Sequence, residues 1–79
     1  MKRSRYEIIA EILEYCHTPR KFTQIVQYCN LSTPLAKQYI ELLLGRELLT
    51  VKDGNLYETT NNGLKFLNFF EKLYKMILY

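Results

Sequence analysis

Four segments of the chain repeat apolar residues at the spacing of an α-helix, and the central pair lies between residues 22 and 49. The first helix of this pair repeats at i, i+3, i+4 and i+7, which predicts one buried face over about two turns. The residues of this face are Phe22, Ile25, Val26 and Cys29. Asn30 follows them, and it suits the left-handed conformation that often ends a helix.

The second helix of the pair is expected to begin at Ser32 or Thr33, because both residue types serve as N-caps. Pro34 then falls in the first turn, where a missing N–H costs nothing. We expect its buried side to carry Leu35, Ile40, Leu43 and Leu44, and its exposed side to carry Thr33, Pro34, Lys37, Gln38 and Glu41. Two helices joined by a turn of about three or four residues form a helix-turn-helix.

A helix before this pair is expected to run from Ser4, as its N-cap, to about His17. Its main buried face is Ile9, Ile12, Leu13 and Cys16, and Ile8 and Tyr15 add a second apolar flank. A helix with two apolar flanks contacts two neighbours. Pro19 ends the helix because it lacks an N–H donor and restricts the residue before it. Residues 20–22 are expected to be extended and to add a strand to a small sheet.

A β-hairpin is expected after the central helices. Residues 48–52 favour a β-strand. They are followed by Asp53-Gly54, or by Asp53-Gly54-Asn55 as a slightly longer loop, and a turn of this kind is a strong hairpin signal. Residues 56–59 form the returning strand. Such a hairpin either reaches a partner with its tip or only covers the core, and the sequence leaves both roles open.

The last helix is expected to begin after Thr60, its N-cap, and to continue to the C-terminus. Its apolar residues fill an arc of about 200°, whereas packing against one core needs only about 100°. Four of them alternate by four and three, the spacing of a coiled-coil seam. We therefore predict that this helix pairs with its copy in a second subunit, the alternative being that it packs only on the first helix. The predicted dimerisation residues are Phe66, Leu67, Phe70, Leu73, Tyr74 and Ile77.

The predicted fold is α+β and mostly α, in one small domain of 79 residues. Residues 1–60 form the three-helix core with its hairpin, and residues 61–79 form the dimerisation helix of the same compact unit. An apolar fraction of 48%, with seven Tyr and four Phe, exceeds what so short a chain needs for its own core. The sequence has no apolar run of about 18 residues and no secretion signal, so we expect a soluble cytoplasmic protein.

The residues that suit metal or catalytic chemistry are few. Cys16, His17 and Cys29 do not complete a tetrahedral metal site, and no paired Cys-x-x-Cys motif is present. We expect both thiols to be buried and apolar, although a disulfide between them stays open. The single histidine has no evident catalytic partner, and no glycine-rich phosphate loop occurs. We expect no enzyme activity, no cofactor, no metal and no identifiable small-molecule effector.

The net charge of +3 permits contact with phosphates but does not by itself argue for it. The distribution says more, because Arg3 and Arg5 come before the first helix, and Arg20 and Lys21 before the second. The carboxylates of the first helix form a separate stripe that faces away from any polyanion.

The order of these elements resembles the winged-helix DNA-binding domains. More narrowly, it resembles small archaeal regulators of this kind, also found in archaeal viruses, which dimerise through a long C-terminal helix. The resemblance rests on RSRYEIIAEIL, TQIVQYCNLS and YETTNNGLKFL, which with their spacing cover nearly the whole chain. Such sequences usually place Gly where Glu47 stands, whereas here a glycine comes earlier, at Gly45. The resemblance also places Gly63 at the close-packed start of the dimer helix.

The resemblance implies that Ser32 caps a recognition helix whose outward side chains enter the major groove. With the basic residues above, the predicted DNA-binding set is Ser32, Thr33, Pro34, Lys37, Gln38, Glu41, Lys52, Asn55, Arg3, Arg5, Arg20 and Lys21. The predicted function is a homodimeric, sequence-specific double-stranded DNA-binding protein that regulates transcription, in the host cytoplasm if the chain is viral. Two alternatives are a winged-helix module that binds protein and an architectural protein that coats DNA with little sequence preference.

Overall fold

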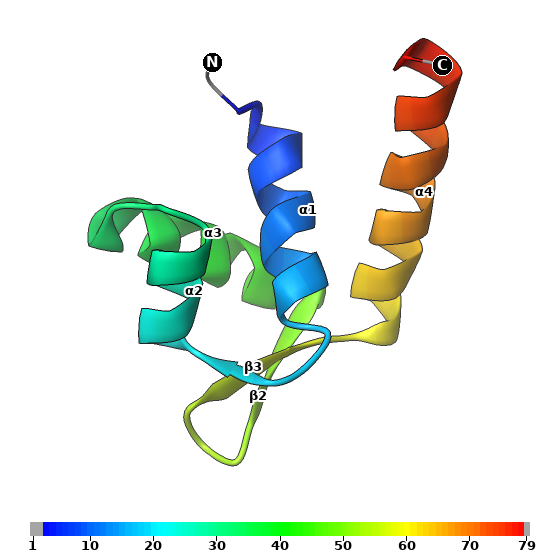
Figure 1. Ribbon diagram of the computed structural model, residues 1–79. Helices are drawn as coiled ribbons and strands as arrows, with labels where there is room; N and C mark the ends of the chain where they lie inside the picture. The colour runs from blue at the N-terminus through cyan, green and yellow to red at the C-terminus, as the bar shows by residue number, and fades with distance from the viewer. Residues whose placement is uncertain (1–2, 79) are drawn as a thin grey trace.

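The chain folds into four helices and a three-stranded sheet (Figure 1). The computed structural model describes residues 3–78; Met1, Lys2 and Tyr79, and the side chain of Leu78 that we counted in the apolar arc, lie outside the described residues. The elements are α1 (Arg5–Tyr15), β1 (Arg20–Lys21), α2 (Phe22–Tyr28), α3 (Thr33–Gly45), β2 (Leu49–Lys52), β3 (Leu56–Thr59) and α4 (Asn61–Leu78). The predicted order of elements is confirmed.

The start of α1 is held by reciprocal hydrogen bonds between Ser4 and Glu7. The Ser4 hydroxyl accepts from the Glu7 N–H at 3.1 Å, and the Glu7 carboxylate accepts from the Ser4 N–H at 2.9 Å. This capping box satisfies two N–H groups that the first turn would otherwise leave unpaired. The bond from the Ser4 backbone is the main reason that the pKa of Glu7 lies below its usual value. The predicted N-cap is confirmed.

Helix α2 ends as the sequence predicts. Asn30 takes a φ of 53°, and the Leu31 N–H donates to the Val26 carbonyl at 3.1 Å. A left-handed residue closed by this long backward bond is the Schellman ending of a helix. It lets the chain reverse within a few residues, and α3 starts at once with Ser32 as its N-cap.

The sheet is antiparallel with the strand order β1-β3-β2. Strands β2 and β3 are joined by the longer of the two predicted loops, and Asp53 and Gly54 have φ values of 53° and 84°. The sheet is tied to the end of α1, because the Thr59 N–H donates to the Cys16 carbonyl at 2.9 Å and the Thr59 hydroxyl donates to the Leu13 carbonyl at 2.6 Å.

The core lies between α1, α2, α3 and the first residue of β2. Its fully buried side chains include Ile12, Leu13, Ile25, Leu43, Leu49, Cys16 and Cys29. Both thiols are free, and burial raises the pKa of Cys16 to about 12 and that of Cys29 to about 11. Thiols with such pKa values stay protonated at neutral pH and pack as small apolar groups.

One residue that we predicted to be buried is exposed. Leu35 keeps 38% of its surface in solvent, and Ala36 occupies the buried position instead. The reason is the phase of the helix. Ile40 and Leu43 follow Ala36 at intervals of four and three, so the stripe through the core centres on Ala36 and leaves Leu35 about 100° away from it.

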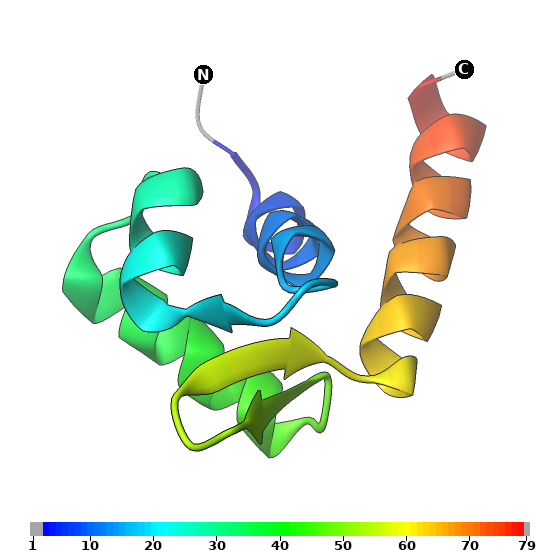
Figure 2. The same cartoon turned by 60° about the horizontal axis from the view of Figure 1, so that its bottom comes forward.

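Helix α4 begins at Thr60, as predicted. The Thr60 hydroxyl accepts from the Gly63 N–H at 3.1 Å and donates to the Glu47 carbonyl at 2.6 Å. The helix runs beside α1 but diverges from it toward its C-terminal end (Figures 1 and 2). Phe66, Leu67 and Phe70 are half-buried, whereas the later apolar side chains are exposed. The contact of α4 with the rest of the domain is therefore closer over its first half than over its second half.

Replacing Glu47 by glycine is expected to raise the free energy of unfolding by about 1 kcal/mol. Glu47 follows Arg46, the C-cap of α3, with a φ of 60°, and an L side chain in this region costs about 1–2 kcal/mol. Glycine adopts this φ without that cost, although part of the gain is lost because its unfolded chain has more freedom. Urea denaturation measures the change. As the control, Glu41→Gly in the interior of the same helix should lose about 1 kcal/mol; a loss at both positions would contradict the prediction.

Candidate nucleic-acid interface

The outward side of α3 is an exposed, mostly polar helix face. Ala36, Ile40 and Leu43 are buried and hold the helix against the core. This packing turns the predicted recognition residues to solvent, and all five are exposed: Thr33, Pro34, Lys37, Gln38 and Glu41. The Ser32 hydroxyl accepts from the Leu35 N–H at 3.3 Å, so its side chain caps the helix.

Two exposed leucines flank this polar face, and the sequence analysis did not predict that they are exposed. Leu35 and Leu42 are both partly exposed and lie one above the other, seven residues apart. They line a shallow groove together with Arg5, Gln38 and Tyr39. The seven-residue spacing, offset from the buried stripe, was the available signal. The groove brings Arg5 of α1 next to Gln38 of α3, which the sequence alone did not show.

The outer face of the sheet carries two lysines in one row. Leu56 of β3 is opposite Lys21 on one side and Lys52 on the other. Residues opposite one another in a sheet point to the same face, and two strand spacings separate these lysines by about 10 Å. The Lys52 ammonium lies 3.9 Å from the Glu58 carboxylate, and both side chains are partly exposed. Asn55 is exposed in the loop beyond this row.

Comparison with known proteins identifies the fold. A family model described as winged helix-turn-helix matches residues 2–78. The chain belongs to the winged helix-turn-helix family. Helices α2 and α3 are thus its helix-turn-helix, and the β2–β3 hairpin is its wing. Figure 2 shows α3 and the wing next to each other on one side of the molecule.

Among solved structures, the winged-helix chain is similar to the crystal structure of Sso10a-2, a DNA-binding protein from Sulfolobus solfataricus. The TM-score is 0.83 at 23% sequence identity, and the match covers 94% of this chain and 81% of that chain. At this identity the likeness supports the fold. Comparison with curated protein sequences gives no match.

Two predicted DNA-binding arginines of this winged helix are engaged within the protein. The Arg3 guanidinium lies 2.8 Å from the Glu11 carboxylate and also donates to the Asn30 carbonyl at 3.4 Å. Arg20 donates from Nε to the Tyr15 carbonyl at 3.1 Å, and its guanidinium lies 4.1 Å from the centre of the Tyr15 ring. These contacts keep both arginines half-buried. Arg5 and Lys21 are the exposed members of the two basic pairs.

Two further observations on the described residues concern metal binding and membrane spanning. No group of three His, Cys, Asp or Glu side chains within residues 3–78 is placed to hold a metal ion. In the same part of the chain, no helix is long and apolar enough to cross a membrane.

Proposed function

We propose that this protein is a homodimeric, sequence-specific DNA-binding regulator of transcription that places α3 in the major groove. The observation that carries the proposal is the exposed polar face of α3, with Arg5 on one flank and the lysine row of the sheet beyond its end. A major groove about 12 Å wide admits one helix, and a helix with long polar side chains reads base edges there.

The side chains of α3 match the chemistry of base edges. The Gln38 amide pairs bidentately with adenine, and Lys37 donates to guanine or to a phosphate. The methyl group of Thr33 and the ring of Pro34 contact the methyl group of thymine. Glu41 lies farther along the helix, where it accepts from cytosine. These few residues specify sequence, and the remaining contacts position the protein.

The wing and its neighbours supply the phosphate contacts. Lys21 and Lys52 point to the same face of the sheet, so both contact phosphates along the same edge of a DNA groove. Asn55 extends this edge from the loop, and Arg5 adds a charge beside α3. Phosphate contacts of this kind make the affinity fall steeply with salt. Ser32 acts indirectly, by capping α3; Arg3 and Arg20 act by holding the helices in place.

A single copy has too few cations to bind DNA tightly, and the proposed dimer supplies the rest. Residues 61–79 provide the dimerisation helix, and residues 3–60 carry the contacts to DNA. Two copies place two α3 helices about 34 Å apart, one turn of B-DNA, on a palindromic site. The support for this step is the apolar side of α4, where Leu73, Met76 and Ile77 are exposed.

Selection of bound sites from random DNA tests the proposal. We expect one enriched palindromic sequence. The double variant Lys37→Ala/Gln38→Ala should lose about 30-fold or more in affinity for it, because it removes two base contacts that contribute about 1–3 kcal/mol each. The matched control is Lys65→Ala/Asn68→Ala, which also removes one lysine and one carboxamide side chain, from the exposed polar face of α4.

The outcome of this selection separates the competing functions. No DNA binding at low salt would contradict the proposal and favour a module that binds protein. Binding without an enriched sequence, together with a steep salt dependence, would favour a protein that coats DNA. Equal losses in the α3 variant and its control would contradict the assignment of α3 as the reading helix.

A further inference from the structure

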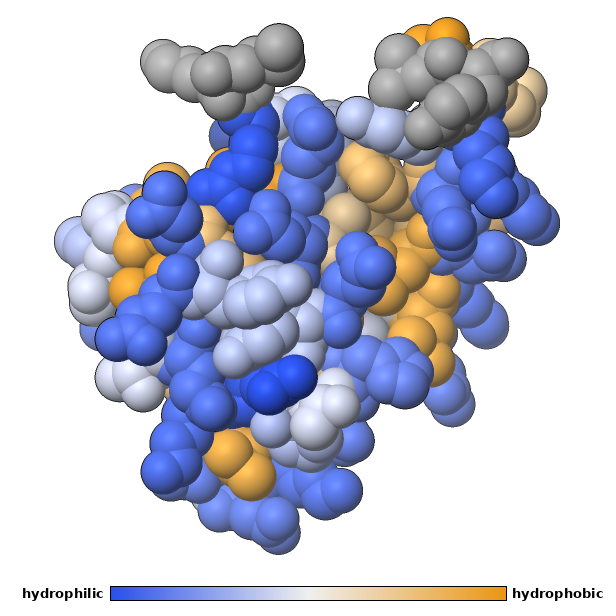
Figure 3. All heavy atoms as spheres, in the orientation of Figure 1, coloured by the Kyte–Doolittle hydropathy of each residue, from blue (hydrophilic) through white to orange (hydrophobic). Residues whose placement is uncertain are grey.

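A groove with almost entirely apolar walls lies between the start of α1 and the last three turns of α4. Its volume is about 440 Å³, and apart from Ser4 and Glu7 its walls are apolar and aromatic. The space-filling view shows the other side of the α1–α4 contact, where apolar surface between the two helices is bordered by polar residues (Figure 3). The groove exists because α4 diverges from α1.

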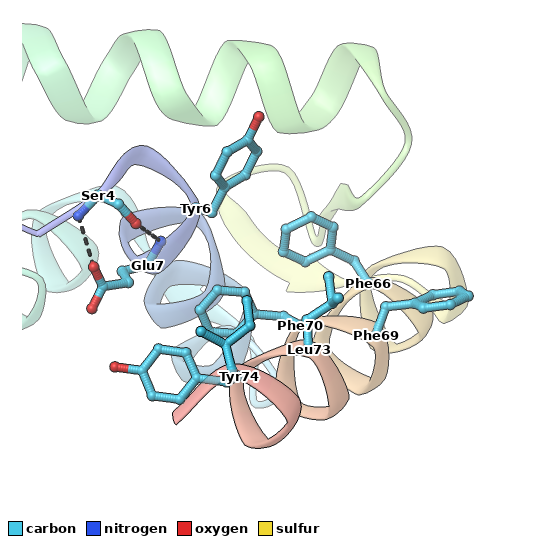
Figure 4. Close-up of a pocket in the computed structure, with 9 residues that line it drawn as sticks. Ser4, Tyr6, Glu7, Phe66, Phe69, Phe70, Leu73 and Tyr74 are labelled. Atoms are coloured by element: carbon cyan, nitrogen blue, oxygen red, sulfur yellow. Dashed lines mark hydrogen bonds between the residues drawn. The ribbon is translucent and has the colours of Figure 1, made fainter. Parts of the chain in front are cut away.

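The two walls of the groove come from different helices. Tyr6 extends from α1, and Phe66, Phe70 and Leu73 extend from α4 on the other side (Figure 4). Tyr6 is 63% exposed, although it lies between Ser4 and Glu7, whose capping box holds the first turn of α1 in place. The capping box therefore fixes the α1 wall of the groove in position, and the α4 wall is apolar.

The opposite side of the α1–α4 contact is different. There the surface between the two helices is lined by Glu14, Glu71 and Lys75 as well as by apolar residues. Charged residues are depleted at the centres of protein interfaces and are common at their rims. Of the two sides of the α1–α4 contact, the side with Tyr6 is thus the more similar in composition to an interface centre.

We infer that α4 of the partner subunit binds in this groove. In that arrangement α1, through Tyr6, belongs to the dimer interface together with the two α4 helices. The inference rests on the proposed dimer and adds to it, since the sequence pattern places only α4 in the interface. A two-fold dimer is self-complementary, so each α4 is both a wall of its own groove and the occupant of the other.

The occupant is argued from fit and area. Beside the groove, α4 carries an exposed apolar flank with Phe69, Leu73 and Met76 at i, i+4 and i+7, which is the stripe that a helix inserts into a groove. At about 150–250 Å² for a large side chain, the exposed fractions of these residues and of Tyr6 and Ile77, which range from 55% to 81%, leave on the order of several hundred Å² of apolar surface in each copy. A stable two-protein interface buries about 800 Å² on each side, and single exposed patches of this size are uncommon on monomers.

The geometry also connects dimerisation to the DNA-binding face. Tyr6 and Arg5 are adjacent in α1; Tyr6 lines the groove beside α4, and Arg5 lines the groove beside α3. A partner helix that packs on Tyr6 therefore holds the turn of α1 that presents Arg5 to the DNA. Without the partner, the Tyr6 side of this turn is exposed to solvent.

Sedimentation equilibrium of the Tyr6→Ala variant tests the inference. We expect the dimer dissociation constant to rise at least about tenfold, because a central tyrosine is removed from both copies at once. The matched control is Tyr28→Ala: Tyr28 is 60% exposed, but it lies on α2 and stacks on Tyr15 at 4.0 Å. It should leave the dimer dissociation constant unchanged.

A second measurement does not depend on the variant being folded. Fluorotyrosine placed at position 6 should give a ¹⁹F signal that shifts with protein concentration through the dimer transition, whereas the same label at position 28 should not. Unchanged values at position 6 in both experiments, with a dimer present, would overturn the inference and leave the α4 pairing intact. In that case the groove would still be open, and an apolar dye such as anilinonaphthalene sulfonate would bind the dimer. A wild-type protein that stays monomeric would overturn both the inference and the proposed dimer.

Discussion

Replacing Gly63 by alanine is expected to lower the free energy of unfolding by about 3 kcal/mol, a large share of what so small a domain has. A Cβ atom at this position would lie 2.5 Å from the Leu48 carbonyl oxygen and 2.5 Å from the Thr59 methyl carbon. The Leu48 oxygen cannot move aside easily, since it is backbone and accepts a hydrogen bond from the Thr60 N–H at 3.0 Å. Relief of the clash requires the start of α4 to move away from the sheet.

The matched control for this prediction is Gly45→Ala. Gly45 ends α3, and no heavy atom of the described residues lies within 4 Å of an added Cβ. The same chemical change should therefore be neutral or stabilising by up to about 1 kcal/mol, because alanine favours helix more than glycine does. Urea denaturation of both variants at one protein concentration measures the difference. Similar free energies for the two variants would show that the approach at Gly63 is looser than the structure describes.

Replacing Leu73 by glutamate is expected to abolish the dimer while leaving the domain folded. Leu73 is 55% exposed in the single chain, so a charge there costs the fold little. In the proposed dimer the same position is buried and occurs twice, and an unpaired buried charge costs several kcal/mol. The dimer dissociation constant should rise at least about a thousandfold, as measured by sedimentation equilibrium. Affinity for a palindromic site should then fall about a hundredfold or more, because the two half-sites are no longer bound by one particle.

Asn68→Glu provides the comparison for Leu73→Glu. Asn68 is exposed on the opposite, polar face of α4, so this variant adds the same charge to the same helix without touching the apolar side. Any general repulsion of DNA by the added charge appears equally in both variants. A difference in DNA affinity therefore measures dimerisation alone. If both variants remain dimers, α4 is not the interface.

The sequence by itself determined the elements of this fold, because the signals for them are local. The Ser4 and Thr60 caps, the left-handed Asn30 and the Asp53-Gly54 turn each depend on a few neighbouring residues, and all were predicted. The excess of apolar residues on α4 was also evident, since periodicity alone measures the width of an apolar face. The backbone conformation of Glu47, where similar sequences usually place glycine, was not predicted; the structure gives this residue a φ of 60°.

The tertiary structure decided which residues of each candidate site lie together. Leu35 was predicted to be buried and is exposed, because the packing of α3 centres on the small Ala36. Arg3 and Arg20 were grouped with the DNA-binding residues because they lie close to other basic residues in the sequence. In the structure Arg3 contacts Glu11, eight residues away, and Arg20 contacts Tyr15, five residues away. The lysine row depends on strand register, and the Tyr6 groove depends on the angle between α1 and α4. The lysine row and the Tyr6 groove arise from contacts between distant segments, which no local pattern encodes.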